Sequence, residues 1–191
     1  MSIASGSFGR YLQKTENTQK ISDWVTRNAV SKEDALQKIA MIAHDYNEYG
    51  SDYEIHGVLE KFAEPDETLH RGAGDCDCKS GLINAIVDGL PLELKPDVYR
   101  VTIGKFFGDI PNPREFHAWN ECRVGDTWYI LDGTSGKMIV SPHIRYLGMY
   151  HIYPESLQIT EPVTEIAIRI FTLPLIVVNS INQDSASGIR R

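Results

Sequence analysis

Along the first half of the chain, apolar residues recur at the spacing of one helix face. The pattern predicts helices over residues 17–28, 31–50, 53–62, 65–72 and 76–87. Ser31 suits the N-cap of the second of these helices, and Pro65 with two following acidic residues suits the first turn of the fourth. The early part of the chain is therefore expected to be helical.

In the second half, apolar and polar residues begin to alternate, as they do in strands. The pattern predicts strands over residues 98–103, 116–124 and 127–131. Gly125-Asp126 is a turn signal that would join the last two strands as a hairpin. Short strands or loops are expected beyond Asp132, and the apolar run 166–178 is expected to form one or two strands broken by Pro174. The order predicts an α+β fold, with N-terminal helices packed on an antiparallel sheet.

Length and composition limit the organisation of the chain. The 191 residues are 42% hydrophobic and suit one domain over residues 16–160, preceded by a small polar arm (1–15) and followed by an apolar strand segment with a polar tail (161–191). The net charge of −7 argues against a nucleic-acid surface, because phosphate binding needs clustered Lys and Arg. We expect no signal peptide and no membrane span, because the most apolar run is too short to cross a bilayer.

The three cysteines, Cys76, Cys78 and Cys122, cannot all pair within the chain, and the first two are too close to bridge comfortably. This number and spacing do not indicate a disulfide framework, so reduced thiols are expected. Reduced thiols fit a cytoplasmic protein or, alternatively, a component of a virion assembled there. Cys122 is expected to be a buried strand residue.

Cys76 is the candidate nucleophile. It opens a predicted helix, whose free amides and positive dipole end favour a thiolate. A protonated histidine nearby would favour the thiolate further, whereas the flanking Asp75 and Asp77 would raise the pKa of the thiol. We expect Asp75 to act mainly as the N-cap, which leaves the contributions of helix and histidine dominant.

Cys78 lies two residues further along the same predicted helix, roughly 200° around its axis. The two thiols therefore point in opposite directions, and only one of them can face a histidine. Cys76 is the better candidate because it begins the helix and follows Gly74-Asp75. Cys78 is expected to face the core or a neighbouring loop.

His117 and Asp132 are the candidate partners of Cys76. His117 shares a strand face with Trp119, whose ring could shield the imidazole from water. Because the hairpin turn is short, Asp132 can lie beside His117 and hold one imidazole nitrogen while the other faces the thiol. This is the order of groups needed for a nucleophile, its general base and the acid that orients the base.

Acyl chemistry also needs donors for the oxyanion that forms on the attacked carbonyl group. The backbone N–H of Cys76 is one candidate. A second donor is often a side chain upstream of the nucleophile, and Asn47 and Tyr53 are the candidates considered.

Three motifs resemble those of the transglutaminase-like superfamily, which includes papain-like cysteine peptidases, amidases and acyl transferases. The first motif, Pro65-Asp66-Glu67-Thr68-Leu69 followed by Gly72-Ala73-Gly74-Asp75-Cys76, resembles the family's approach to the nucleophile. The second, His117-Ala118-Trp119, resembles its histidine strand, and the third, Trp128-Tyr129-Ile130-Leu131-Asp132-Gly133-Thr134, resembles its aspartate strand. The resemblance covers about residues 55–135. It implies a papain-like α+β core with a Cys76–His117–Asp132 triad. Cys78 departs from the pattern, because an acid is common at that position.

The resemblance implies cysteine-dependent acyl chemistry on amide bonds of a protein or peptide, by a peptidase, an amidase or a transglutaminase. No cofactor and no metal are expected. The alternative is a non-catalytic or weakly active module, for example a phage virion component, that assembles with other proteins through residues 166–178. A zinc site of Cys76, Cys78, Cys122 and His117 is disfavoured, because Cys-x-Cys is not the usual Cys-x-x-Cys spacing.

Overall fold

The computed structural model describes residues 9–59, 61–107, 116–143, 145–154 and 159–160, all of which belong to the unit Met1–Thr160. The segments 1–8 and 161–191 lie outside the described residues, and with them the predicted apolar run 166–178. The described helices are α1 (Gly9–Leu12), α2 (Glu16–Asn28), α3 (Lys32–Asp45), α4 (Asp52–His56), α5 (Pro65–Arg71) and α6 (Cys76–Asp88). The described strands are β1 (Glu48–Tyr49), β2 (Ala73–Gly74), β3 (Val98–Phe106), β4 (Phe116–Val124), β5 (Thr127–Asp132), β6 (Lys137–Ser141), β7 (Tyr146–Ile152) and β8 (Ile159–Thr160).

The predicted helix boundaries follow the capping residues where these are present. Ser31 is the N-cap of α3, and its side chain accepts a hydrogen bond from the backbone N–H of Asp34. Gly72 ends α5 in the left-handed conformation, with φ of 63°. Helix α3 ends earlier than predicted, at Asp45, because the chain continues into the two-stranded parallel pairing of β1 with β2.

Within the predicted N-terminal arm (1–15), Gly9–Leu12 form α1. Leu12 is buried, and its carbonyl oxygen accepts a hydrogen bond of 3.0 Å from the side-chain amide of Asn84 in α6. A Cβ atom at Gly81 would lie 2.8 Å from the carbonyl oxygen of Tyr11. The glycine therefore allows the backbone of α1 to approach α6 closely.

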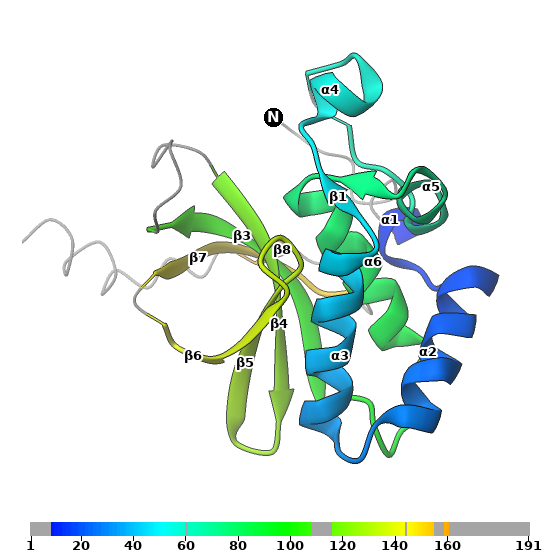
Figure 1. The fold of residues 1–191 in the computed structure, drawn as a ribbon. Helices are drawn as coiled ribbons and strands as arrows, with labels where there is room; N and C mark the ends of the chain where they lie inside the picture. The colour runs from blue at the N-terminus through cyan, green and yellow to red at the C-terminus, as the bar shows by residue number, and fades with distance from the viewer. Residues whose placement is uncertain (1–8, 60, 108–115, 144, 155–158, 161–191) are drawn as a thin grey trace, which may run out of the picture. The chain divides into compact units, whose positions relative to one another are not determined.

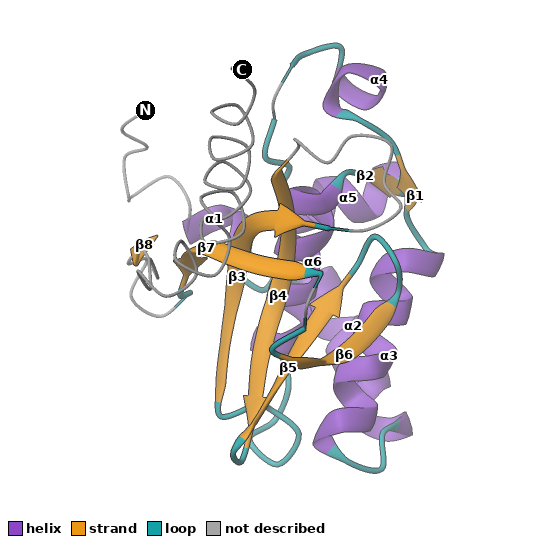
Figure 2. Ribbon diagram, turned by 90° about the vertical axis from the view of Figure 1, so that its left-hand side faces the viewer, coloured by secondary structure: helices purple, strands orange, loops and turns teal. Residues whose placement is uncertain are grey.

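Six antiparallel strands form the main sheet in the order β6-β5-β4-β3-β7-β8. Helices α2, α3 and α6 lie on one side of this sheet (Figures 1 and 2), and α6 packs against β3 and β4. The hairpin of β4 and β5 is present as predicted, with Gly125 at φ of 58° in its turn. These elements confirm the α+β class, with the N-terminal helices packed on an antiparallel sheet.

The main core lies between the helices and the sheet. Its buried apolar residues come from α2, α3, α6, β3, β4 and β5, and include Leu36, Ile39, Leu82, Ile86, Tyr99 and Cys122. Tyr99, Val101 and Ile103 share a face of β3, as their alternation predicted. Cys122 is fully buried, also as predicted. No helix in the described part of the chain is both long and apolar enough to cross a membrane.

The central strand β4 is buried on both faces, from His117 to Cys122. Helix α6 covers one face, where the side-chain amide of Asn120 donates to the carbonyl oxygen of Ser80 at 3.1 Å. The other face carries Trp119, which is completely buried. Strand β6 ends at Ser141 and β7 begins at Tyr146, so only a short connection separates them along the chain. In the sheet, however, β5, β4 and β3 lie between β6 and β7. The sheet must therefore curl around the face that carries Trp119.

Candidate active site

Cys76 is held at the first position of α6 by the capping of that helix. Asp75 is the N-cap, and its carboxylate accepts a hydrogen bond of 3.3 Å from the backbone N–H of Cys78. The hydroxyl of Ser80 donates to the carbonyl oxygen of Cys76 at 2.7 Å. The parallel pairing of β2 with β1 fixes the approach to the helix, because Gly74 lies opposite Tyr49.

Cys76 and Cys78 differ as the helix geometry predicted. Cys76 is half-buried and lines a cleft, whereas Cys78 is 2% exposed. The thiol of Cys78 donates to the carbonyl oxygen of Lys61 at 3.7 Å, in the loop that precedes α5. The thiol that solvent can reach is therefore that of Cys76.

His117 and Asp132 are in contact, as the short hairpin predicted. The Nε2 atom of His117 lies 3.1 Å from Oδ2 of Asp132, and both side chains are buried. The backbone N–H of Thr134 donates to Oδ1 of Asp132 at 2.9 Å, and the hydroxyl of Tyr146 donates to Oδ2 at 2.8 Å. Burial alone would raise the pKa of Asp132, but the hydrogen bonds and charge of His117, together with the Tyr146 and Thr134 bonds, hold it below its usual value.

Three aromatic rings surround the imidazole of His117. The centroids of Phe106, Trp119 and Tyr146 lie 5.5, 6.0 and 6.4 Å from that of His117. Trp119 and His117 share a strand face, as the strand period predicted. The rings limit access of water to the His117–Asp132 contact, so this contact lies in a medium of low polarity.

The cleft beside Cys76 has a volume of about 550 Å³. Its lining residues come from the β1–α4 region, the start of α6 and the strands β3 and β4, and they are Tyr49, Ser51, Asp52, Leu59, Phe62, Asp75, Cys76, Asp77, Ile103, Phe116, His117 and Ala118. Cys76 and His117 therefore face the same space. The two candidates for the second oxyanion donor, Asn47 and Tyr53, are not among the lining residues. The side-chain amide of Asn47 instead donates to the carbonyl oxygen of Ala43 at 3.4 Å.

The surroundings of Cys76 raise the pKa of its thiol, whereas we expected the helix and a protonated histidine to lower it. Burial raises the pKa of the thiol to about 12, against the lowering effect of a hydrogen bond with the backbone of Ala118. The negative charges of Asp75, Asp77 and Asp132 raise it further. Burial and the neighbouring carboxylates therefore oppose the thiolate, although Asp75 also caps the helix as expected.

The carboxylates next to Cys76 form an acidic group at the cleft. Burial and the neighbouring Asp75 raise the pKa of Asp77 to about 9. Burial also raises the pKa of Asp52, and the charge of Asp75 adds to this effect. Within the described part of the chain, Oδ2 of Asp77 and Oδ1 of Asp52 are buried without a hydrogen-bond partner. Such atoms are available to a cation or to a donor on a ligand.

Two groups of described side chains place three potential metal ligands within 4.8 Å of one another. One consists of Asp75, Asp77 and Cys78, and the other of Asp52, His56 and Cys78. Carboxylate oxygens suit Ca²⁺, whereas a mixed carboxylate, imidazole and thiol set suits Zn²⁺. Neither group is the zinc site considered from the sequence, which consisted of Cys76, Cys78, Cys122 and His117.

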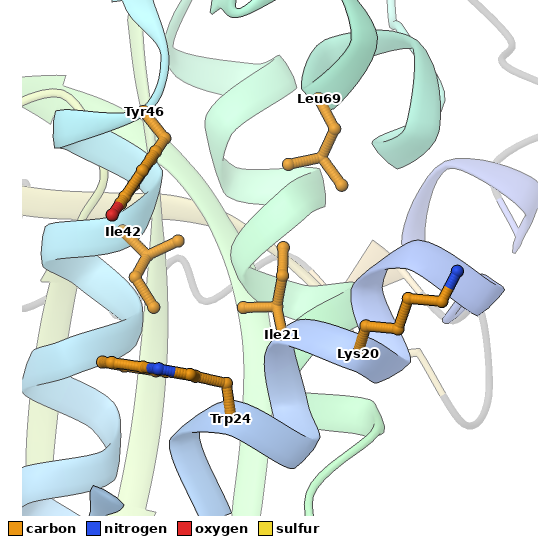
Figure 3. A pocket seen from close by; sticks show the side chains of 6 residues that line it. All are labelled: Lys20, Ile21, Trp24, Ile42, Tyr46 and Leu69. Atoms are coloured by element: carbon orange, nitrogen blue, oxygen red, sulfur yellow. The ribbon is translucent and has the colours of Figure 1, made fainter.

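A second cavity, of about 430 Å³, lies on the outer side of the helical layer. Figure 3 shows Ile21 and Trp24 of α2, Ile42 and Tyr46 of α3, and Leu69 of α5 around it, with Lys20 at its margin. It shares no lining residue with the cleft at Cys76, and no described cysteine, serine or threonine lines it. The chemistry is therefore expected at the cleft.

Sequence analysis missed several residues of the site. Tyr146 contacts Asp132, but the segment after Asp132 has no clear alternation, so neither β7 nor the direction of this side chain was predicted. Asp52 was not identified because its position at the cleft depends on the pairing of β1 with β2. Asp77 was identified from the sequence only as an acid that flanks Cys76.

Several solved structures share this fold. The protein LapG of Legionella pneumophila, described as calcium-bound, is 16% identical with a TM-score of 0.57, and the match covers 84% of this chain and 90% of LapG. Another LapG structure is 17% identical with a TM-score of 0.54, covering 78% of this chain and 83% of that one. A candidate cysteine protease from Cytophaga hutchinsonii is 21% identical with a TM-score of 0.50; the match covers 68% of this chain but 44% of that protein, less than half its length.

No protein-family model and no curated protein matches the sequence. The identities to the solved structures are all low, so these likenesses concern the fold. They show that the chain shares the α+β fold of these structures, which agrees with the fold that the sequence motifs predicted.

Proposed function

We propose that this protein is a cysteine-dependent peptidase or amidase whose catalytic residues are Cys76, His117 and Asp132. The observation that carries the proposal is the cleft that Cys76 and His117 both line, while Asp132 contacts Nε2 of His117 at 3.1 Å. The substrate is a protein or peptide, since the cleft is open and large enough for an extended chain segment.

The reaction begins with attack of the Cys76 sulfur on the carbonyl carbon of a substrate amide, while Nδ1 of His117 accepts the thiol proton. The carbonyl oxygen becomes an oxyanion, for which the backbone N–H of Cys76 is a candidate donor. When the C–N bond breaks, His117 returns the proton to the leaving amine. Water then attacks the thioester with His117 as base, which releases the carboxylic acid and restores the thiol.

The protonation state of Cys76 bears on the role of His117. Because burial raises the pKa of the thiol to about 12, His117 acts as a general base during attack rather than as the partner of a preformed thiolate. Asp132 supports this role, because its carboxylate accepts a hydrogen bond through Nε2 and stabilises the imidazolium that forms. A primary amine in place of water would give acyl transfer from the same thioester.

We further propose that Asp75 and Asp77 hold a calcium ion. LapG is described in a calcium-bound and an EGTA-treated form. In this chain the carboxylate oxygens of Asp75 and Asp77 lie close together beside the Cys78 thiol, and Oδ2 of Asp77 has no hydrogen-bond partner. The ion would offset the negative charge of these carboxylates next to Cys76. Asp75 would keep its role as N-cap of α6, which positions the nucleophile.

The proposed function is tested by incubating the protein with a mixed peptide library, with and without a primary amine, and identifying products by mass spectrometry. Cleavage that disappears in both Cys76→Ala and His117→Ala but persists in Cys78→Ala supports the proposal. Products that contain the amine indicate acyl transfer. Cleavage that persists in Cys76→Ala overturns the proposal, and so does its absence from the wild-type protein with Ca²⁺ present. The alternative of a non-catalytic module that assembles with other proteins depended on segments outside the described residues, and no observation favours it.

A further inference from the structure

The carboxylate of Asp132 has a hydrogen-bond donor that the proposed triad does not include. The hydroxyl of Tyr146 lies 2.8 Å from Oδ2 of Asp132, the same oxygen that contacts Nε2 of His117 at 3.1 Å. Tyr146 comes from β7, whereas His117 and Asp132 come from β4 and β5. One carboxylate oxygen is therefore shared by donors from two other strands.

We propose that Tyr146 is a positioning residue, which holds Oδ2 of Asp132 where His117 can use it and thereby selects the imidazole tautomer. The effect of Tyr146 on catalysis rests on the proposed function, but its effect on the tautomer of His117 does not. A deprotonated carboxylate only accepts hydrogen bonds, so both Tyr146 and Nε2 of His117 must donate to it. Nδ1 of His117 is then left without a proton, in the state that a general base requires.

The tyrosine is itself fixed firmly enough for this role. Its ring packs against Phe106 and Trp119, with centroids 4.7 and 5.3 Å away, and Phe106 is also its register partner across β3 and β7. Burial and the charge of Asp132 raise the pKa of the Tyr146 phenol well above its usual value, so the hydroxyl keeps its proton. The hydroxyl is therefore a permanent donor.

The reach of Tyr146 depends on the curl of the sheet. In the strand order, β3 and β4 lie between β7 and β5, yet the Tyr146 hydroxyl contacts Asp132 at the end of β5. Gly104 makes this possible, because a Cβ atom at this position would lie 2.8 Å from the Trp119 ring. The absent side chain leaves room for this ring beside Tyr146.

The test compares Tyr146→Phe with a matched control, Tyr99→Phe. Tyr99 is also a sheet tyrosine that donates to a carboxylate, Oδ1 of Asp88 at 2.8 Å, but it lies in the main core and does not line the cleft. Each change removes one hydroxyl and keeps the ring. Two readouts are taken: the tautomer of His117 by ¹⁵N NMR at a pH where the imidazole is neutral, and kcat and KM for a cleaved peptide.

In Tyr146→Phe we expect a larger fraction of the Nδ1–H tautomer of His117. We also expect kcat to be about tenfold lower with little change in KM, because the variant loses one hydrogen bond to a charged group. Tyr99→Phe should change neither. An unchanged tautomer ratio in Tyr146→Phe overturns the inference, and so does an equal response in Tyr99→Phe. If the wild-type protein cleaves nothing, the proposed function fails, and the NMR comparison alone decides the inference.

Discussion

His117 contacts Asp132 as a diagonal neighbour across the β4–β5 hairpin. The register pairs Asn120 with Leu131, which places Trp119 rather than His117 directly opposite Asp132. Diagonal side chains on one face of an antiparallel pair remain within reach of each other. The contact of 3.1 Å therefore follows from the hairpin register, and Trp119 fills the place directly opposite the carboxylate.

The first prediction separates the two neighbouring cysteines. Cys76→Ala should abolish peptide or amide hydrolysis, whereas Cys78→Ala should largely retain it, because only Cys76 lines the cleft. Iodoacetamide should also label Cys76 much faster than Cys78 or Cys122, which are 2% and 0% exposed. Loss of activity in Cys78→Ala, with Cys76→Ala still active, would show that the nucleophile is wrongly assigned.

The second prediction concerns the close approach of β7 to β3. A Cβ atom at Gly104 would lie 2.0 Å from the carbonyl oxygen of Leu147, a backbone atom that cannot move away cheaply. Gly104→Ala should therefore lower the free energy of unfolding by about 2 kcal/mol or more, as measured by urea denaturation. Gly125→Asn is the control, because a Cβ there meets nothing within 4 Å and Asn tolerates a positive φ. Equal stability of Gly104→Ala and the wild type would contradict the packing described.

The third prediction is a loss of stability in mild acid that depends on His151. Burial and the charge of Arg100 lower the pKa of His151 to about 4, although Glu121 opposes the shift. Between pH 6.5 and 4 the unfolded chain therefore binds a proton that the folded protein does not, so stability falls as the pH falls through this range. The slope from this one group is at most about 1.4 kcal/mol per pH unit.

His151→Gln should flatten this part of the stability curve, measured by thermal unfolding at several pH values. Glutamine retains a polar partner for the hydroxyl of Thr102, which is 3.0 Å from Nδ1 of His151. His44→Gln is the matched control, because His44 is exposed and should leave the slope unchanged. The same slope in all three proteins would rule out His151 as its source.

The fourth prediction tests the calcium ion. After treatment with EGTA, added Ca²⁺ should raise the melting temperature of the wild-type protein, because a ligand that binds only the folded state stabilises it. Asp77→Asn should lose most of this increase, and Asp23→Asn, a change at an exposed position of α2, should keep it. Binding should strengthen as the pH rises, because Ca²⁺ must displace the proton that the raised pKa of Asp77 retains. An equal calcium response in Asp77→Asn would show that the ion binds elsewhere or not through this carboxylate.

The fifth prediction concerns the apolar run 166–178, which lies outside the described residues. A run this apolar should be covered, because an exposed one would favour aggregation. If it packs on its own domain, a chain that ends before Thr164 should misfold. If it docks on a partner, that chain should stay folded and monomeric while the full chain associates. Circular dichroism and light scattering distinguish these outcomes, and a full-length monomer with the run accessible to protease would contradict both.

The predictions that succeeded from sequence were those set by local geometry. Asp75 caps α6 because its carboxylate reaches the backbone N–H of Cys78, an interaction within one helical turn. Cys76 and Cys78 point apart because of the helix period, and His117 and Trp119 share a face because of the strand period. The β4–β5 hairpin follows from a turn of two residues, and it brings Asp132 within reach of His117.

The sequence by itself thus determined the α+β class, the helix that begins at Cys76, and the strands that carry His117 and Asp132. Only the tertiary structure decided the reach of Tyr146 to Asp132, the burial that raises the pKa of the Cys76 thiol, and the cleft that Cys76 and His117 share. The physical reason is range: capping, helix period and hairpin register act between residues close in sequence. Burial, charge and contacts between strands distant in sequence depend on how the whole sheet curls around Trp119.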